Sequence, residues 1–290
     1  MEIKWIKTFV VTAKFENFRK ASEELFLTQP AVTKHIQRLE ENLNIQLFER
    51  VGTKVILTSA GHKFYSFARA LLTKYEEGME EFESWKQGYN RKLVIATAPQ
   101  IASSFLPSLV RHFINEHPNI EVIINILKSY EIGEEISIGK ADIGLSRLLP
   151  IQTNIKVNTV HKEPVILVGP NCKEASDLDE QTAIHKYRLV THNHPDYWDH
   201  LLNDIKRHYP TVRTMKVNQI EVTKRFIEEG LGISYLPITM IKEELTTNKL
   251  VEIKADKITP PTSYTYVLTK VESEEVLAFI NFLKNALSRL

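Results

Sequence analysis

The residues best suited to chemistry on another molecule lie on one face of a helix predicted from about Gln29 to Glu41. This face carries amides, hydroxyls and cations, and no acid before Glu40. An amide side chain can pair with adenine through two atoms, Arg or Lys can pair with guanine, and a Thr methyl group can meet the methyl group of thymine. The residue types therefore predict that this helix reads base edges in the major groove of DNA. The polar face consists of Gln29, Pro30, Thr33, Lys34, Gln37 and Arg38.

A second helix and a tight turn are expected to hold this face in place. Asn17 is suited to cap a helix that ends near Leu25, and Thr28 is suited to cap the next one. Pro30 lies in the first turn of that helix, where a missing backbone donor costs nothing. Small Ala21 lies where the two helices would cross. Two helices joined by such a tight turn form the helix-turn-helix arrangement. The inward face of the second helix follows the spacing i, i+4, i+7, i+11 with Val32, Ile36, Leu39 and Leu43.

A small hairpin is predicted after these helices, with Gly52 at its tip between Leu47-Phe48 and Val55-Ile56-Leu57. Arg50 and Lys54 would project from this wing and neutralise phosphates without reading sequence. The alternative is a three-helix interaction module with a solvated polar face, which would leave the acid-poor face and the wing unexplained. The residues predicted to bind DNA are Arg19, Thr28, Gln29, Pro30, Thr33, Lys34, Gln37, Arg38, Arg50 and Lys54.

A long helix is predicted from Ser59 to about Trp85, with a narrow apolar stripe. The stripe alternates steps of four and three, as a heptad seam does, through Phe64, Ala68, Leu71, Tyr75, Gly78, Phe82 and Trp85. Such a stripe has to be buried, and a second copy of the helix is the simplest partner. A two-fold dimer also matches a palindromic DNA site. The alternative is that the stripe packs on the C-terminal part of the chain.

The region after Asn90 alternates predicted strands and helices, which indicates a parallel sheet with helices on both faces. Helices are expected from about Ser104 to Glu116, from about Pro195 to Tyr209 and over Glu221 to Glu228. Folds of this kind bind ligands beyond the carboxyl ends of their strands, where loops and helix N-termini converge. The predicted strands include residues 93–96, 120–127, 143–145, 165–168, 188–190, 215–217, 233–235 and 264–268.

The side chains at those strand ends form a candidate ligand site. One Arg, one Lys, two His and several helix N-termini favour an anion that carries carboxylates. The alternative for the Ser, Asn and Gln residues is ordinary helix capping, and Arg147 could equally form a surface ion pair. The candidate residues are Pro99, Ile101, Ser103, Ser104, Lys128, Ser129, Arg147, His192, His194, Asn218 and Gln219.

Composition sets further limits on the kind of protein. The chain has 290 residues, 43% of them apolar and 25% charged, with a net charge of +1, which is a globular balance. The first 62 residues carry nine Lys or Arg and seven Asp or Glu, so DNA affinity must come from placement rather than bulk charge. No stretch approaches the roughly 20 apolar residues of a membrane span, the N-terminus does not resemble a signal peptide, and Cys172 is the only cysteine. A cytoplasmic location is therefore expected.

Catalysis, cofactors and metals have no support in the sequence. It contains no Gly-rich phosphate loop, nucleophile elbow or paired carboxylate motif. His192, His194 and His200 have no zinc-site spacing and no accompanying Cys or Glu. We therefore expect a chain that is not an enzyme, needs no cofactor and binds no metal. Cys172 is expected to be an incidental thiol.

The N-terminal pattern closely resembles the LysR family of bacterial regulators. The match runs from Phe18-Arg19-Lys20-Ala21-Ser22 and Thr28-Gln29-Pro30-Ala31-Val32-Thr33 through Leu39-Glu40 to Ala60-Gly61. Asn17 and His35 depart from the usual residues. The segment Glu229 to Pro237 also looks like this family. The resemblance implies a winged DNA-binding domain, a dimerising linker helix and a two-lobed effector domain of the periplasmic-binding-protein type, usually assembled as a tetramer.

Within the family, the segments Thr191 to Trp198 and Met215 to Val217 resemble the branch that regulates a citrate synthase gene in bacilli. The resemblance points to a di- or tricarboxylic acid such as citrate as the effector. The expected partners are double-stranded operator or promoter DNA, this small anionic metabolite and further copies of the chain. RNA polymerase is a further candidate partner, and no membrane is expected.

The sequence thus predicts an α/β protein that regulates transcription under the control of a metabolite. The expected parts are a DNA-binding domain over residues 1–58, a linker helix over 59–88, one effector lobe over 91–162 and 271–290, and a second over 163–270. Two rivals stay open. A solute-binding protein or small-molecule enzyme with an accessory helical domain would carry a secretion signal or a catalytic constellation. A protein-interaction module would show no salt-dependent DNA binding.

Overall fold

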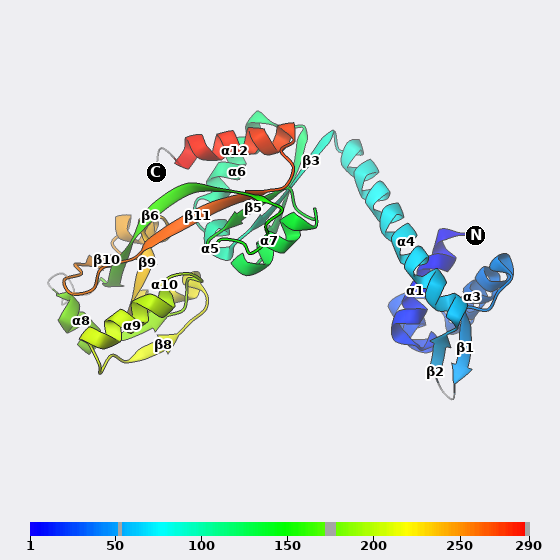
Figure 1. Cartoon of the computed structure of the whole chain (residues 1–290), viewed down its shortest axis with the longest axis horizontal. Helices are drawn as coiled ribbons and strands as arrows, with labels where there is room; N and C mark the ends of the chain where they lie inside the picture. The colour runs from blue at the N-terminus through cyan, green and yellow to red at the C-terminus, as the bar shows by residue number, and fades with distance from the viewer. Residues whose placement is uncertain (52–53, 172–177, 288–290) are drawn as a thin grey trace. The chain divides into compact units, whose positions relative to one another are not determined.

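The computed structural model describes residues 1–51, 54–171 and 178–287, and it divides into two compact units, Met1–Gly88 and Tyr89–Leu290 (Figure 1). The elements of the first unit are α1 (Ile3–Phe15), α2 (Phe18–Glu24), α3 (Gln29–Leu43), β1 (Phe48–Val51), β2 (Lys54–Leu57) and α4 (Ser59–Lys86).

The helices of the first unit begin where the sequence places their caps. The Asn17 side chain accepts the backbone N–H groups of Arg19 and Lys20, at 2.9 and 3.1 Å. Thr28 caps α3 by accepting the N–H of Ala31 at 3.4 Å. These side chains satisfy backbone donors that the first turn of a helix leaves unpaired. The start of α3 is therefore fixed by local sequence.

The core of the first unit joins α1, α3, the wing and the start of α4. Glu40, at the end of α3, accepts the backbone N–H groups of Leu47 and Phe48, at 2.7 and 3.1 Å, and so fixes the chain between α3 and the wing. The wing is the antiparallel pair β1 and β2, and its predicted tip, Gly52, lies outside the described residues. The buried core consists of Ile6, Phe9, Ile36, Leu39, Leu47, Phe48, Val55 and Ala68.

The predicted stripe along α4 divides into two parts. Phe64, Ala68 and Leu71 pack on the core of their own unit. Further along the helix, Tyr75, Phe82 and Trp85 are exposed, and the rings of Phe82 and Trp85 stack with centroids 5.8 Å apart. The second half of the stripe is thus left without a covering partner within its own unit.

The described residues of the second unit form one mixed sheet of nine strands, in the order β4-β3-β5-β11-β6-β9-β7-β8, with β10 paired to β6. Its elements are β3 (Arg91–Thr97), α5 (Pro99–Ala102), α6 (Leu106–Glu116), β4 (Ile120–Ile126), α7 (Ser129–Ser137), β5 (Ile143–Ser146), β6 (Lys156–Pro170), α8 (Glu180–Lys186), β7 (Arg188–Thr191), α9 (Trp198–His208), β8 (Thr214–Lys216), α10 (Ile220–Glu228), β9 (Gly232–Pro237), α11 (Ile238–Thr246), β10 (Leu250–Ile253), β11 (Thr262–Thr269) and α12 (Glu274–Leu287).

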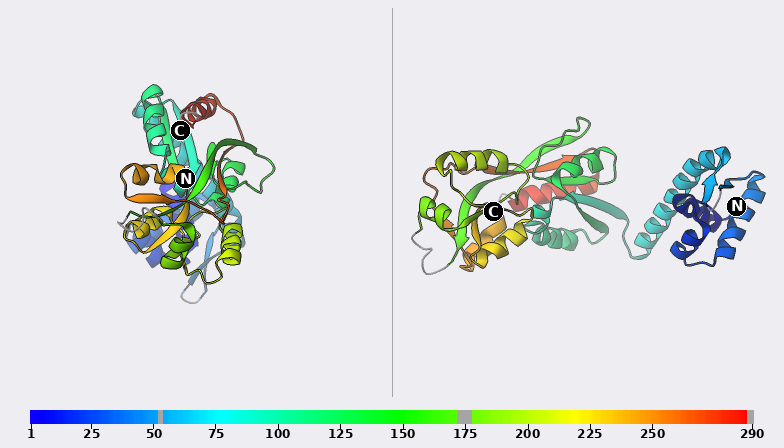
Figure 2. Two further views of the ribbon diagram at one scale, coloured as in Figure 1. Left: turned by 90° about the vertical axis from the view of Figure 1, so that its left-hand side faces the viewer. Right: turned by 90° about the horizontal axis from the view of Figure 1, so that it is seen from below.

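The expectation of a purely parallel sheet is wrong. The pairs β3–β4, β3–β5, β7–β8 and β7–β9 are parallel, but β6 and β11 run antiparallel to each other and to their outer neighbours. Figures 1 and 2 show these two long strands side by side along the second unit. No helix lies between β5 and β6 or between β10 and β11, so the alternation of strands and helices could not reveal the direction of these two strands.

Two main groups of buried side chains lie along this sheet. The first includes Leu93, Phe113 and Phe279, and the second includes Val165, Trp198 and Tyr235. We call the part with β3–β5, α5–α7 and α12 lobe I, and the part with α8–α11 and β7–β10 lobe II. Strands β6 and β11 belong to both. The boundaries expected after residues 162 and 270 lie inside β6 and just beyond β11.

None of the helices in the described ranges combines the length and the hydropathy that crossing a membrane would require.

Candidate nucleic-acid interface and ligand cavity

The predicted polar face of α3 lies opposite the face that packs in the core. Val32, Ile36 and Leu39 are buried, whereas the side chains predicted to read bases lie outward. Gln29, Pro30, Lys34, Gln37 and Arg38 are exposed, and Thr33 is half-buried. The Thr33 hydroxyl donates to the carbonyl of Gln29 at 3.1 Å, which leaves its methyl group for apolar contact. The major groove of B-DNA admits one α-helix, so α3 can present these side chains to base edges.

His35, which departs from the family pattern, joins α3 to α1. Its Nδ1 lies 2.9 Å from the Thr8 hydroxyl oxygen, and that hydroxyl lies 2.8 Å from the carbonyl of Lys4. Because the hydroxyl donates its one proton to Lys4, His35 Nδ1 must be the donor to Thr8. Burial lowers the pKa of His35, with a further lowering by Lys4. His35 therefore positions the recognition helix against the core.

The cations at the edge of this surface are exposed, and two of them form ion pairs. Arg19 lies 3.3 Å from Glu23, and Lys54 lies 3.5 Å from Glu16. Exposed pairs of this kind contribute at most about 1 kcal/mol, so either cation can exchange its partner for a phosphate. Arg50, on β1, is exposed. The phosphate contacts of these residues stay predictions.

A cavity of about 430 Å³ in the second unit collects strand-end residues from both lobes. It brings together five of the candidate ligand-site residues, and sequence reasoning missed the other five that line it. The lining consists of Pro99, Gln100, Ala102, Ser103, Ile126, Lys128, Asn218, Gln219, Ile220 and Glu221. Each missed residue is within two positions of a predicted one, so the strand-end rule located the region but not the individual side chains.

The chemistry of this cavity favours a small anion. Gln219 is the N-cap of α10, and its side chain accepts no hydrogen bond from the backbone of the helix. The first backbone N–H groups of α10 therefore face the cavity without a side-chain acceptor. The start of a helix attracts negative charge. Lys128 adds an ammonium group from lobe I. Gln100, which is buried, links the lobes by donating from Nε2 to the carbonyl of Asn193 at 3.4 Å.

Arg147 is not among the residues that line this cavity, and its Nε and Nη2 have no hydrogen-bond partner in the described part of the chain, so its contact with the ligand stays a prediction. The side chain is fully buried, and its Nη1 lies 2.8 Å from Glu163 and 3.2 Å from the Ser263 hydroxyl. Glu163 in turn accepts the backbone N–H and the hydroxyl of Thr239, at 2.8 and 2.7 Å. Arg147 follows β5 in lobe I and Thr239 lies in lobe II. The ion pair thus joins the two lobes in the interior.

His194 is also buried and does not line the cavity, so its contact with the ligand likewise stays a prediction. Its Nε2 lies 3.1 Å from the Ser263 hydroxyl, and its ring stacks on Tyr197 with centroids 4.4 Å apart. Burial, with a smaller effect of Arg147, holds the pKa of His194 well below its ordinary value. His194 is therefore neutral and supplies no positive charge to an effector.

Four further candidates lie away from the cavity lining. Ile101 is buried in the core of lobe I, and the Ser129 hydroxyl accepts the backbone N–H of Arg147 at 3.3 Å. Ser104 donates to the carbonyl of Ile101 at 3.3 Å. His192 lies 2.7 Å from the Thr191 hydroxyl. These side chains are engaged in local structure, and their contact with a ligand stays a prediction.

The buried His194 predicts a pH dependence of stability. An unfolded histidine titrates near pH 6.5, and the pKa of folded His194 is well below that. As pH falls below about 6.5 the unfolded chain takes up a proton that the folded chain does not. The free energy of unfolding should therefore drop by up to about 1.4 kcal/mol per pH unit for this group. Urea unfolding at several pH values between 7.5 and 5.5 measures this drop in the free energy of unfolding.

The control for that experiment is His112→Gln, because His112 is exposed on α6. The His112→Gln protein should keep the pH dependence of the wild type, whereas His194→Gln should reduce its slope; the rest comes from His35 and His161, because burial lowers the pKa of both. An equal slope in the wild type and His194→Gln would contradict the assignment of a neutral buried ring.

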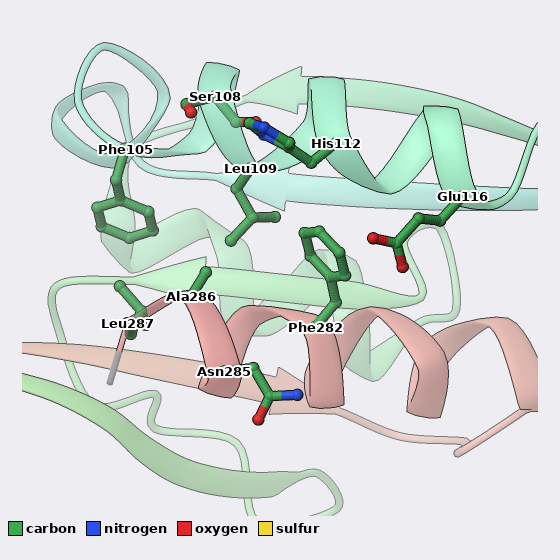
Figure 3. Close-up of a pocket in the computed structure, with 9 residues that line it drawn as sticks. All are labelled: Phe105, Ser108, Leu109, His112, Glu116, Phe282, Asn285, Ala286 and Leu287. Carbon is green, nitrogen blue, oxygen red and sulfur yellow. The ribbon is translucent and has the colours of Figure 1, made fainter. Parts of the chain in front are cut away.

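A second cavity, of about 550 Å³, lies between α6 and α12 (Figure 3). Leu109, Phe282 and Leu287 supply apolar surface there, and His112 and Glu116 project from α6. It contains no strand-end residue and none of the candidate site residues. In the described part of the chain, no three or more His, Cys, Asp or Glu side chains come together in an arrangement suited to a metal.

Comparison with protein families gives two matches along the chain. Residues 3–62 match the bacterial regulatory helix-turn-helix protein, lysR family, and residues 86–288 match the LysR substrate binding domain. Together the two matches include α3, the wing and the cavity of the second unit.

Two curated relatives extend over nearly the whole chain. The HTH-type transcriptional regulator CitR of Bacillus subtilis (strain 168) is 41% identical over 288 residues, 98% of this chain and 99% of the relative. An uncharacterized HTH-type transcriptional regulator of the same organism, YxjO, is 35% identical over 290 residues, 100% of this chain and 99% of the relative.

Solved structures share the fold at lower identity. Full-length CbnR complexed with its target DNA matches with a TM-score of 0.66 and 20% identity, covering 99% of this chain and 100% of that one. Vibrio fischeri DarR in complex with DNA matches with a TM-score of 0.67 and 23% identity, covering 98% and 99%. With a helix-turn-helix unit and a substrate-binding unit that both match, the chain belongs to the LysR family of DNA-binding transcriptional regulators and is not an enzyme.

Proposed function

We propose that this regulator binds a small carboxylate metabolite in the 430 Å³ cavity and changes its DNA binding in response. The observation that carries the proposal is the cavity itself, where the uncapped start of α10 and Lys128 meet from different lobes. A ligand held by both lobes favours one arrangement of them through its differential affinity. By linkage, DNA must change the affinity for the ligand by the same factor.

The effector that we propose is a di- or tricarboxylate such as citrate. With Arg147 and His194 buried, Lys128 is the single cation among the residues that line the cavity, and Glu221 is the single anion. Lys128 and the start of α10 suit one carboxylate each, and the carboxylate of Glu221 is already paired with Lys224 at 2.9 Å. The proposal therefore includes dicarboxylates and tricarboxylates alike. The similarity to CitR supports control of a citrate synthase or related central-carbon gene.

We propose the predicted parts as the working units: residues 1–58 for DNA, 59–88 for dimerisation and two effector lobes with the boundaries given above. The exposed Tyr75, Phe82 and Trp85 on α4 support a homodimer through this helix. Pairing of dimers into a tetramer, and contact with RNA polymerase at the promoter, complete the proposed assembly.

The Lys128→Ala variant tests the effector site. Binding of full-length protein to its operator is measured by fluorescence anisotropy while citrate, malate or succinate is titrated. The variant should bind operator as the wild type does but need about tenfold more ligand for the same shift, because a hydrogen bond to a charged group contributes about 1.5–3 kcal/mol.

The matched control is Lys140→Ala, which removes an exposed lysine of the same lobe that lies 3.6 Å from Glu135. It should leave the ligand response unchanged. A normal response in Lys128→Ala, with normal operator binding, would place the ligand elsewhere.

A further inference from the structure

Arg147 uses only one end of its guanidinium group in the interior of the second unit. Its Nη1 lies 2.8 Å from Glu163, 3.2 Å from the Ser263 hydroxyl and 3.4 Å from the carbonyl of Tyr264. Nε and Nη2, which form another edge of the same group, have no hydrogen-bond partner in the described part of the chain. The side chain is fully buried, and a buried charged donor without an acceptor is strongly unfavourable. This edge therefore points to an acceptor that the described residues do not supply.

The acceptors next to Arg147 are already occupied. Glu163 accepts from Arg147 at Oε1, and at Oε2 it accepts the backbone N–H and the hydroxyl of Thr239, at 2.8 and 2.7 Å. His194 Nδ1 accepts a backbone N–H at 3.3 Å, so its Nε2 carries the ring proton and donates to the Ser263 hydroxyl oxygen at 3.1 Å. That oxygen also accepts from Arg147, which leaves the proton of Ser263 for a further acceptor. The interior is thus rich in donors here and short of acceptors.

Two more side chains without partners extend this cluster along β6 and β11. His161 pairs in register with Thr265, two positions from the pair of Glu163 and Ser263, so the four side chains share one face of the two strands. His161 Nε2 and Thr265 Oγ1 are buried and have no partner among the described residues. Burial lowers the pKa of His161, Glu163 raises it and Arg147 lowers it, which places the ring close to both charges. Both side chains can donate to an acceptor beside Arg147.

The charge and the enclosure of this edge identify the class of occupant. An anion accepts hydrogen bonds from several directions and brings no donor, whereas a water molecule would add two donors to a cluster that is short of acceptors. Arg147 is fully buried and is not among the residues that line the 430 Å³ cavity, so the anion must be small enough to be enclosed. Glu163 lies at Nη1, and an ion at the other edge would share the guanidinium charge with it.

We propose that the Nε–Nη2 edge of Arg147 binds a small inorganic anion of the halide class, which is chloride in a cell. The cluster draws Arg147 from the end of β5 in lobe I, and Thr239 and His194 from lobe II. The ion thus completes the hydrogen bonding of a buried contact between the lobes and stabilises their arrangement. This site is separate from the proposed effector cavity and does not depend on which metabolite binds there.

Bromide tests this site directly, because it replaces chloride and can be located by its anomalous X-ray scattering. Crystals of the full-length protein soaked in sodium bromide should show an anomalous peak within hydrogen-bond distance of Arg147 Nε and Nη2. In solution, the midpoint of thermal unfolding of the second unit should rise when sodium chloride or bromide replaces sodium methanesulfonate at equal ionic strength. The rise should saturate, and should reach about 3–6 °C at about ten times the dissociation constant.

A pair of variants assigns the effect to Arg147. Arg147→Lys keeps a positive charge for Glu163 but removes the Nε–Nη2 edge, so the halide-dependent rise should disappear. The matched control is Arg91→Lys, which changes an exposed arginine of the same unit that lies 2.6 Å from Glu274. It should keep the full rise. If Arg147→Lys does not fold, the position of bromide in the wild type decides the question alone.

Three outcomes would overturn the proposal. Bromide-soaked crystals with a water molecule, and no anomalous peak, at the Nε–Nη2 edge would show that no halide binds there. A saturable rise of the same size in Arg147→Lys and wild type would assign the halide effect to another site. Citrate that displaces bromide and places a carboxylate on Arg147 would show that this edge belongs to the effector site.

Discussion

Lys34→Ala and Gln29→Ala should each weaken operator binding by about ten- to a hundredfold while the protein keeps its fold. Both side chains are exposed at the start of α3, opposite the buried Val32, Ile36 and Leu39. A good contact between a side chain and a base edge favours the correct base over a wrong one by about 1–3 kcal/mol. Every 1.4 kcal/mol corresponds to a tenfold change in affinity. Fluorescence anisotropy with operator and with scrambled DNA measures the loss.

Two controls separate base reading from loss of charge. Lys284→Ala removes an exposed lysine of α12 in the other unit and should bind operator as the wild type does. Arg50→Ala should weaken binding to operator and to scrambled DNA alike. It should also reduce the slope of log affinity against log salt concentration by about one. Wild-type operator affinity in both Lys34→Ala and Gln29→Ala would contradict the role of α3.

Arg147→Ala should destabilise the second unit by about 3–5 kcal/mol, because it leaves Glu163 buried without its cation. Both side chains of this pair are at most 1% exposed, and their Nη1–Oε1 distance is 2.8 Å. The loss is much larger than for an exposed pair such as Lys140 and Glu135. Urea unfolding followed by circular dichroism gives the free energy.

The double variant Arg147→Met, Glu163→Leu distinguishes a structural pair from a ligand contact. Replacing both charges by apolar groups removes the unpaired buried carboxylate, so most of the lost stability should return. A stable Arg147→Ala protein that has lost only its metabolite response would instead show that Arg147 meets the ligand.

The first unit could be predicted nearly residue by residue, because its signals are local. Asn17, Thr28 and Thr58 each accept a backbone N–H at the start of a helix that the sequence places there. The apolar spacing of α3 likewise names the residues that are buried. Caps and helical periodicity depend on neighbours within a few positions, so the sequence carries them directly.

The second unit could be predicted only in outline, because its decisive contacts join distant positions. Ser263 lies next to Arg147 and His194 only because β11 pairs with β6 and β5 in a particular register. An Arg at a strand end looks the same in sequence whether it meets a ligand or a buried Glu. The strand-end rule therefore located the cavity through Lys128 and Asn218, whereas it gave no sign that Arg147 and His194 are buried away from its lining.

The most direct test of ligand-controlled DNA binding is the affinity of the full-length protein for DNA from upstream of its own gene. Fluorescence anisotropy is measured at about 50 and 200 mM salt, with and without citrate. We predict tight binding to this DNA, a fall of about a thousandfold or more at the higher salt, and a shift on adding citrate. Binding no tighter than to scrambled DNA, unchanged by salt or by citrate, would contradict the account.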